Sequence, residues 1–349
     1  MRNRLFLSLT AALSFGMMLF AVLAPAPAKL PYEGRAPSRF SMDDPDAYFF
    51  DRLPHRTALL TLCRDIEFAL GKNEYGGAFC GKNGYIFSNE NTDEAVLARN
   101  LAAFAAFAET ADIPLYTALV PSKTDALPGL LPPLYTAARD ALWERAKTAP
   151  AYLDLLPSLR TAGGAGKYIY YRGDHHLTSL GAYYVYRQLA APLGFSAAEA
   201  ADFAVSVVCA DFAGSDARRL LTAADDRIAL FRARGDSALT VTDGAVRRGL
   251  YDFDACGGDD PYGVFPGYGA GYTTIRHADA HPRILMLCDS YGCALAPFLA
   301  RHFDVDLVDL RYAAPDVRGL LREENYTAVL CYYGMDTLAA HEILYKLQG

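Results

Sequence analysis

The sequence lacks any run of Lys or Arg, and its formal net charge is −7 over 349 residues. Proteins that bind nucleic acid neutralise phosphates with clustered basic side chains, so nucleic acid is not an expected partner. The chain also lacks internal repeats and low-complexity tracts. Because 52% of its residues are apolar, it can bury a sizeable core, which argues against a disordered protein.

Cysteine is also scarce, with seven residues that have neither the spacing of a zinc site nor that of a disulfide scaffold. Cys288 and Cys331 lie in or beside apolar, strand-like runs, and we expect both to be small buried hydrophobic residues. Because seven is an odd number, at least one thiol should stay unpaired. The sequence leaves open whether any two cysteines form a disulfide.

The first 28 residues differ from the rest of the chain. Arg2 and Arg4 precede nineteen uncharged residues, 5–23, and small residues and prolines follow up to Ala28. This pattern is typical of a secretory signal, and the apolar stretch is also long enough to remain in the bilayer. A buried first helix would normally carry charges on its exposed face. We therefore expect residues 1–28 to be a signal peptide or a membrane anchor, and the protein to be extracytoplasmic.

Residues 29–49 are rich in Pro and polar residues and are expected to form a linker. Beyond it, stretches at helical spacing alternate with short apolar runs at 113–120, 167–171, 283–287, 305–310 and 326–332. This alternation predicts a layered α/β fold with a mainly parallel sheet for residues 50–349. The pattern loosens at about 195–282, where we expect an insertion, either a lid over the site or a small β-rich subdomain.

An acid and a base follow the run 167–171, at Asp174 and His176. Open α/β sheets place their chemistry at strand ends, and alternation along an extended segment puts these two side chains on one face. This favours His176 as a general base that Asp174 orients. Two alternatives stay open: His175 and His176 bind a metal, or the segment only caps the helix predicted to begin after Thr178.

A nucleophile is then expected at a second strand end, and Ser290 follows the run 283–287 closely. A sharp strand-to-helix turn there would expose its hydroxyl and direct backbone N–H groups, including its own, toward a developing oxyanion. The alternative is that Asp289 and Ser290 only cap the next helix. Together, Ser290, His176 and Asp174 predict an enzyme that transfers acyl groups through serine.

Further candidates lie at the end of the run 305–310 and beside the serine. Arg311, Tyr312 and Tyr291 are candidates for contacting the substrate or an oxyanion, although Arg311 could equally be an ordinary surface residue. Several tyrosines of the loosely patterned region could stack on sugars or serve in packing: Tyr251, Tyr262, Tyr268 and Tyr272.

The stretch Asp174-His175-His176-Leu177-Thr178 resembles the Asp-His-His-Trp-Thr signature of the bacterial DHHW family, with Leu177 in place of Trp. That family is similar to the periplasmic alginate O-acetylation proteins, whose SGNH-hydrolase-like domain has an Asp-x-His pair ahead of a Gly-Asp-Ser motif. Cys288-Asp289-Ser290 matches this motif except that Cys288 replaces Gly. The resemblance implies the roles assigned above and a three-layer α/β/α sandwich with a mainly parallel sheet. It also implies a permuted order of motifs relative to ordinary SGNH hydrolases.

The same resemblance implies an exported O-acetyltransferase that modifies a cell-envelope or secreted polysaccharide through an acyl-serine intermediate. It also implies a membrane-bound O-acyltransferase partner as acetyl donor, with no metal and no organic cofactor. A carbohydrate acetylesterase would differ only in using water as the acceptor. A non-catalytic glycan-binding protein with the same fold is the main rival, and a metal-dependent hydrolase is a third possibility.

Overall fold

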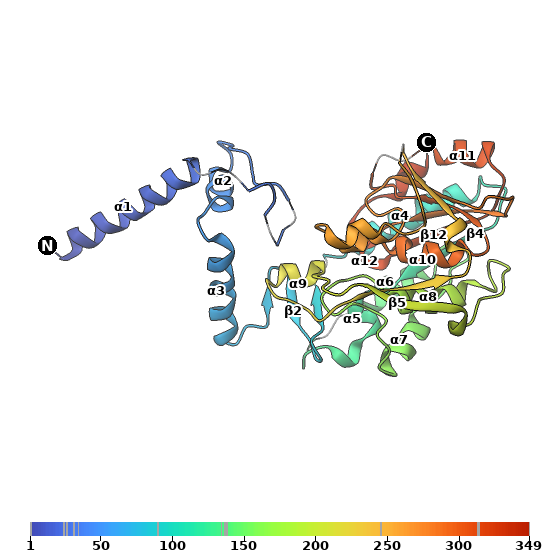
Figure 1. Ribbon diagram of the computed structural model, residues 1–349, viewed down its shortest axis with the longest axis horizontal. Helices are drawn as coiled ribbons and strands as arrows, with labels where there is room; N and C mark the ends of the chain where they lie inside the picture. The colour runs from blue at the N-terminus through green and yellow to red at the C-terminus, as the bar shows by residue number, and fades with distance from the viewer. Residues whose placement is uncertain are drawn as a thin grey trace. The chain divides into compact units, whose positions relative to one another are not determined.

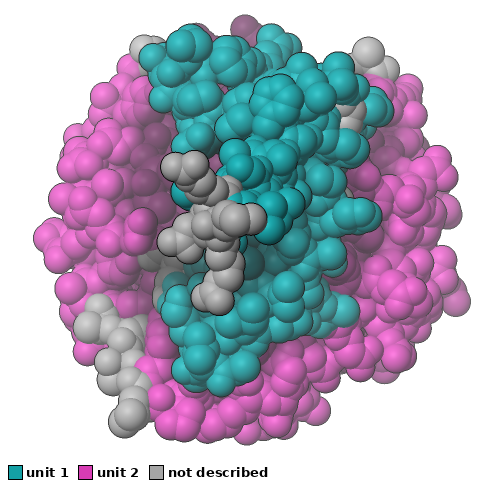
Figure 2. Space-filling view, turned by 90° about the vertical axis from the view of Figure 1, so that its left-hand side faces the viewer, with its two compact units in different colours: residues 1–79, 217–223 teal, residues 80–216, 224–349 magenta. Residues whose placement is uncertain are grey.

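The structure is a computed structural model that describes residues 2–23, 25, 27–30, 32–33, 35–88, 91–133, 135, 139–244, 246–312 and 315–348. Two compact units make up the chain, residues 1–79 with 217–223 and residues 80–216 with 224–349, drawn in teal and magenta in Figure 2. The predicted boundary between linker and domain at residue 50 stays a prediction.

The α-helices are α1 Arg2–Leu23, α2 Pro45–Asp51, α3 Arg56–Ala69, α4 Glu94–Ala108, α5 Lys123–Ala126, α6 Asp140–Ala146, α7 Leu156–Gly164, α8 Ser179–Leu189, α9 Ser215–Arg219, α10 Tyr291–Leu299, α11 Val317–Glu323 and α12 Met335–Ala340. The 3-10 helices are η1 Pro128–Leu130, η2 Ala200–Asp202, η3 Asp236–Ala238, η4 Phe253–Gly257, η5 Pro261–Val264 and η6 Leu344–Gln348. The strands are β1 Glu74–Tyr75, β2 Ala78–Cys80, β3 Ile86–Ser88, β4 Leu115–Val120, β5 Phe203–Cys209, β6 Ile228–Ala233, β7 Thr240–Asp243, β8 Val246–Arg248, β9 Tyr272–Arg276, β10 Arg283–Cys288, β11 Asp304–Val308 and β12 Tyr326–Gly334.

The first unit begins with the apolar helix α1. Its stretch Leu5–Leu23 is long and apolar enough to cross a membrane, with a mean hydropathy of 2.1, and most of its large side chains are exposed. A helix of this composition at the N-terminus is also what a signal sequence forms. Within the segment predicted as a signal or anchor, residues 2–23 are therefore helical, and the stretch from Leu5 presents apolar side chains outward.

A buried carboxylate ties the linker to α2 within the first unit. Arg35 donates two hydrogen bonds to Asp51, at 2.7 and 2.8 Å, and the Ser38 amide donates a third at 2.8 Å. Burial alone would raise the pKa of Asp51, but the hydrogen bonds from Arg35 and Ser38 lower it to about 2. Asp51 therefore stays ionised at neutral pH.

The second unit is built on a seven-stranded sheet, as far as the described residues show, in the order β4-β12-β10-β11-β9-β7-β8. Strands β4, β12, β10 and β11 are parallel, and β9, β7 and β8 continue the sheet in antiparallel fashion. The paired strands β4 and β12 are labelled in Figure 1. The predicted combination of an α/β fold with a central, mostly parallel sheet is confirmed, and the sheet is mixed because of its antiparallel strands β9, β7 and β8. The region 195–282 contributes β7, β8 and β9 to this sheet and the separate hairpin β5–β6.

Alternate residues of β10 face different helices. Leu285 and Leu287 belong to a buried cluster with residues of α4 and α12, such as Phe104 and Leu338. Met286 and Cys288, which alternate with them, lie close to α10. A Cβ at Gly292 of α10 would be 2.5 Å from Cys288 Sγ and 3.2 Å from Met286 Cε. Because the strand is buried on both sides, it is apolar after its first residue, Arg283, as expected for the centre of a parallel sheet.

The carboxyl ends of the parallel strands lie at one edge of the sheet. Cys288 of β10 is in register with Tyr332 of β12, and Gly334 of β12 is in register with Val120 of β4. Open α/β sheets bind ligands outside this edge. Ser290 follows β10 there.

One predicted strand is wrong. Residues 167–171 form no strand of the central sheet, and a single antiparallel bridge joins Tyr170 to Leu177. Its last three residues are apolar because they are buried, and Ile169, Tyr170 and Tyr171 are fully inaccessible. A buried segment that pairs with no strand has the same apolar sequence pattern as a strand of a sheet. Apolar patterning indicates that residues are buried, but not that their backbone pairs with another strand.

The pair Arg35–Asp51 predicts a pH-dependent contribution to stability. Because the folded pKa is about 2 and an unfolded Asp titrates near about 3.9, the contribution is present above pH ~4 and is lost as the pH falls through ~2. Asp51→Asn should therefore lower the thermal midpoint at pH 7, with a difference from wild type that shrinks in acid. Thermal unfolding between pH 7 and 2 measures this, with the exposed Asp43→Asn as control; a difference independent of pH would contradict it.

Candidate active site

The segment that carries Asp174 and His176 is a tight reversal of the chain. Thr178 donates its amide to the Ile169 carbonyl at 3.0 Å, and Tyr171 donates to the His176 carbonyl at 3.3 Å. The Asp226 carboxylate accepts the amides of Arg172 and Gly173 inside this turn, at 2.7 and 2.6 Å. The reversal is therefore held both by its own backbone and from outside.

Asp174 and His176 lie against each other in the interior, and both are 3% exposed. Asp174 Oδ1 is 2.6 Å from His176 Nδ1 and also accepts the His176 amide at 2.9 Å. Asp174 Oδ2 accepts the amide of Ser215 at 2.8 Å. Gly214 allows this approach, since a Cβ there would lie 2.2 Å from the Cβ of Asp174.

Ser290 lies on the other side of the imidazole. Its Oγ is 2.8 Å from His176 Nε2, and its backbone has helical angles (φ −59°, ψ −19°) immediately before α10. Its side chain makes no capping bond to the helix. Asp289 caps instead, accepting the amides of Tyr291 at 3.0 Å and Gly334 at 2.9 Å. The structure thus assigns capping to Asp289 and leaves the Ser290 hydroxyl facing the imidazole.

The charge state of Asp174 decides which ring nitrogen of His176 carries the proton. Burial alone would raise the pKa of Asp174, but the histidines beside it and its hydrogen bonds from His176 and Ser215 hold the pKa well below its usual range. An ionised carboxylate only accepts hydrogen bonds, so the proton lies on Nδ1. Nε2 is then free to accept the hydroxyl proton of Ser290.

Both alternatives for this segment can be compared with the contacts. Thr178 caps α8, since its hydroxyl accepts the Gly181 amide at 3.2 Å, and Asp174 takes no part in that cap. Ligand atoms of Asp174, His175 and His176 do lie within 4.8 Å of one another. However, both His176 nitrogens are engaged, and His175 Nδ1 is 2.8 Å from the Ser215 hydroxyl. A metal ion would have to replace these hydrogen bonds.

Tyr262 is a neighbour of the site whose position the sequence did not predict. Its ring stacks on that of His176, with centroids 4.0 Å apart and planes at 16°. At 1% exposure it has no surface left for a sugar, which excludes the stacking role considered for it. Ser215 was also missed, because nothing in the local sequence indicates that residues 214–215 pack beside Asp174.

A buried ion pair supports the same loops. Lys123 and Asp216 are almost fully buried, with Nζ 2.7 Å from Oδ2. Lys123 also donates to the carbonyl of Arg172 at 3.1 Å. The pair therefore links the chain after β4 to the two segments that hold Asp174.

The three remaining candidates have other partners. Arg311 pairs with Asp309, with Nη2 2.7 Å from Oδ2, and Tyr312 is half exposed at the surface. Tyr291 is buried, its hydroxyl donates to the His175 carbonyl at 2.9 Å, and its ring meets His176 edge-on at 5.3 Å. Among the described residues, no hydrogen bond joins the side chain of any of the three to Ser290. Their substrate or oxyanion role stays a prediction.

Comparison with known families agrees with the motifs. Residues 79–227 match the model of the SGNH hydrolase-like domain of the acetyltransferase AlgX, and residues 157–308 match that of the DHHW proteins. The predicted resemblance to these families is confirmed. The first match contains Asp174 and His176, and the second also contains Ser290. No curated protein matches the chain.

Solved structures show the same fold. PatB1 of Bacillus cereus, in a structure with a sulfonyl adduct, is 21% identical with a TM-score of 0.64, over 77% of this chain and 98% of that one. A DHHW family protein from Eubacterium siraeum is 17% identical with a TM-score of 0.65, over 79% and 96%. At these identities the likeness concerns the fold.

The capping role of Asp289 predicts a loss of stability on its removal. Asp289→Ala leaves two buried amides, those of Tyr291 and Gly334, without an acceptor, at a cost of about 1–3 kcal/mol each. We expect the free energy of unfolding in urea to fall by at least ~2 kcal/mol. The exposed Asp225→Ala is the matched control, and equal stability of the two variants would contradict the assignment.

Proposed function

We propose that the protein is an exported serine-dependent O-acetyltransferase of a cell-envelope or secreted polysaccharide. The observation that carries the proposal is the continuous hydrogen-bonded series Ser290 Oγ, His176, Asp174, with distances of 2.8 and 2.6 Å. Acyl transfer by serine requires this series, a base beside the hydroxyl and an acid that orients the base. The match to an acetyltransferase domain over residues 79–227 supports the reaction class.

In the first half-reaction, His176 Nε2 takes the proton of the Ser290 hydroxyl while Oγ attacks the carbonyl carbon of an acetyl donor. The carbonyl π bond opens to a tetrahedral oxyanion. As it collapses, the bond to the donor oxygen breaks and that oxygen takes the proton from Nε2. Asp174 remains ionised and stabilises the transient imidazolium. The product is an acetyl ester on Ser290.

In the second half-reaction a sugar hydroxyl gives its proton to Nε2 and attacks the acetyl-serine. The Ser290 Oγ leaves and recovers the proton, which restores the resting site. Tyr291 N–H is already bonded to the Asp289 carboxylate, and Gly292 N–H to the Asp289 carbonyl. This leaves the N–H of Ser290 itself as the candidate oxyanion donor at this turn.

Two features support export. The apolar helix α1 has the length of a signal or anchor, and Cys209 is bonded to Cys256 through a disulfide. Structural disulfides persist in oxidising compartments outside the cytosol. A polysaccharide acceptor and a membrane-bound O-acyltransferase as donor partner are consistent with that location, and the proposal includes both.

For the fold we propose a three-layer α/β/α sandwich over residues 50–349. The support is that Leu285 and Leu287 of β10 pack in the cluster of α4, whereas Cys288 and Met286 are the closest neighbours that a Cβ at Gly292 of α10 would meet. The motif order is permuted relative to ordinary SGNH hydrolases, since Asp174 and His176 precede Ser290.

Replacing the nucleophile tests the proposal most directly. Ser290→Ala should abolish hydrolysis of p-nitrophenyl acetate and leave the thermal midpoint nearly unchanged, because the Ser290 hydroxyl bonds only to His176 within the described part of the chain. Peptide mass spectrometry after exposure to the ester should find an acetyl group on Ser290 in the wild type and no acetyl group at position 290 in Ser290→Ala. Ser158→Ala, on α7, is the control. Full activity of Ser290→Ala would refute the assignment, and release of acetate without transfer to any glycan would make the protein an esterase.

Replacing the acid tests the role of Asp174. Asp174→Asn keeps the shape but presents an amide to His176 Nδ1, which favours the wrong tautomer, and the analogous change in a serine protease costs about 10⁴-fold in kcat. We expect a loss of several orders of magnitude in kcat for p-nitrophenyl acetate. The exposed Asp211→Asn should match wild type. A loss of only a few-fold would identify another carboxylate as the partner of His176.

A further inference from the structure

The imidazole of His176 is held at its edge by two hydrogen bonds, one at each ring nitrogen. Such bonds define where the ring points, but they permit the ring plane to tilt about the line that joins the two nitrogens. The stacked ring of Tyr262, at 4.0 Å and 16°, opposes that tilt. Tyr262 belongs to η5, far along the chain from His176.

Tyr262 is itself held on several sides. Its amide donates to Asp260 Oδ1 at 3.2 Å, and Tyr268 donates its hydroxyl to the same carboxylate at 2.6 Å. Its hydroxyl reaches the backbone carbonyl of Ser290 at 3.4 Å. Its ring also packs against Phe265, with centroids 5.0 Å apart. The side chain thus contacts both the base and the nucleophile's residue without facing solvent.

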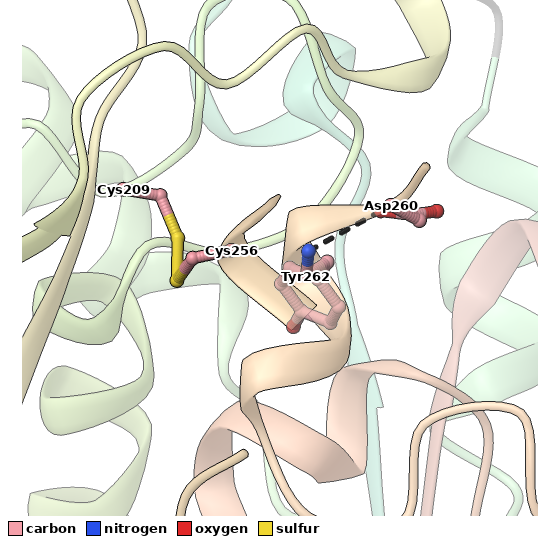
Figure 3. The surroundings of a disulfide bond; sticks show 4 residues. All are labelled: Cys209, Cys256, Asp260 and Tyr262. Atoms are coloured by element: carbon pink, nitrogen blue, oxygen red, sulfur yellow. Dashed lines mark hydrogen bonds between the residues drawn. A yellow bond between two sulfur atoms is a disulfide. The ribbon is translucent and has the colours of Figure 1, made fainter. Parts of the chain in front are cut away.

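A disulfide anchors the segment before Tyr262. Cys256 of η4 is bonded to Cys209 at the end of β5, and η4 packs on η5 (Figure 3). The Asp252 amide also donates to the Val264 carbonyl at 3.0 Å, which closes the segment 252–264 into a loop. The covalent bond therefore restrains the short element that places the Tyr262 ring.

We propose that Tyr262 is a positioning residue, which keeps the His176 ring in the plane that proton transfer requires, and that the disulfide Cys209–Cys256 acts by holding Tyr262. This inference rests on the proposed function. Misplacing a catalytic group by about 1 Å can cost on the order of 10²-fold in rate, so a lost stack should appear in kcat. Substrate binding should change little, because Tyr262 is buried.

The first test compares ring and hydroxyl at position 262 with p-nitrophenyl acetate as substrate. Tyr262→Leu should lower kcat by about ten-fold or more with KM within about three-fold, whereas Tyr262→Phe should stay within about three-fold of wild type. Tyr345→Leu, at an exposed position of η6, is the control. Full kcat in Tyr262→Leu, or an equal loss in Tyr262→Phe, would overturn the role of the stack.

A spectroscopic readout separates positioning from loss of structure. The low-field proton NMR signal of His176 Nδ1–H, assigned by its absence in Asp174→Asn, should persist in Tyr262→Phe and weaken or broaden in Tyr262→Leu at a temperature where both are folded. An unchanged signal in Tyr262→Leu would overturn the inference. This signal does not depend on turnover. If Ser290→Ala proves as active as wild type, the proposed function fails while the positioning of His176 is still tested.

The second test concerns the disulfide. The double variant Cys209→Ser, Cys256→Ser should lose kcat in the same direction as Tyr262→Leu. If the disulfide acts through Tyr262, adding Tyr262→Leu should lower kcat no further than Tyr262→Leu alone, because interacting sites are not additive. Wild-type kcat in the double variant, or additive losses in the triple variant, would overturn the part assigned to the disulfide.

Discussion

The buried carboxylate of Asp174 is the constraint on which the site depends. It accepts three hydrogen bonds, from the amide and ring of His176 and from the amide of Ser215, and its pKa is held well below its usual range. A buried charge without such partners would cost several kcal/mol, so these donors are a condition of folding as well as of chemistry. The same charge directs the free lone pair of His176 toward Ser290.

Two other buried carboxylates organise the surrounding loops in the same way. Asp226 accepts the amides of Arg172 and Gly173 just before Asp174. Asp289 accepts the amides of Tyr291 and Gly334, which joins the start of α10 to the end of β12. Buried backbone amides need acceptors, and irregular loops cannot supply them from secondary structure. Acidic side chains therefore define the loops at this edge of the sheet.

The arrangement has the preorganisation that the proposed acyl transfer requires. Ser290 and His176 come from segments 114 residues apart, yet Ser290 Oγ lies 2.8 Å from His176 Nε2. The central sheet positions Ser290 at the end of β10, and the loops held by buried carboxylates position His176. Because folding already fixes the orientation of these polar groups, no free energy is needed to reorient them during the reaction.

The sequence by itself determined the elements whose pattern is local. The strands β4, β10, β11 and β12 and the helix capped by Thr178 follow from apolar periodicity and capping chemistry. Ser290 follows β10 as predicted, whereas the strand predicted before Asp174 and His176 is absent from the central sheet. Contacts between residues that are far apart in the sequence were decided only by the tertiary structure. Residues 169–171 are buried without forming a strand of the central sheet, Cys209 is bonded to Cys256, and Tyr262 stacks on His176. Local patterns report whether a residue is buried, but which surface buries it is set by how the whole chain folds.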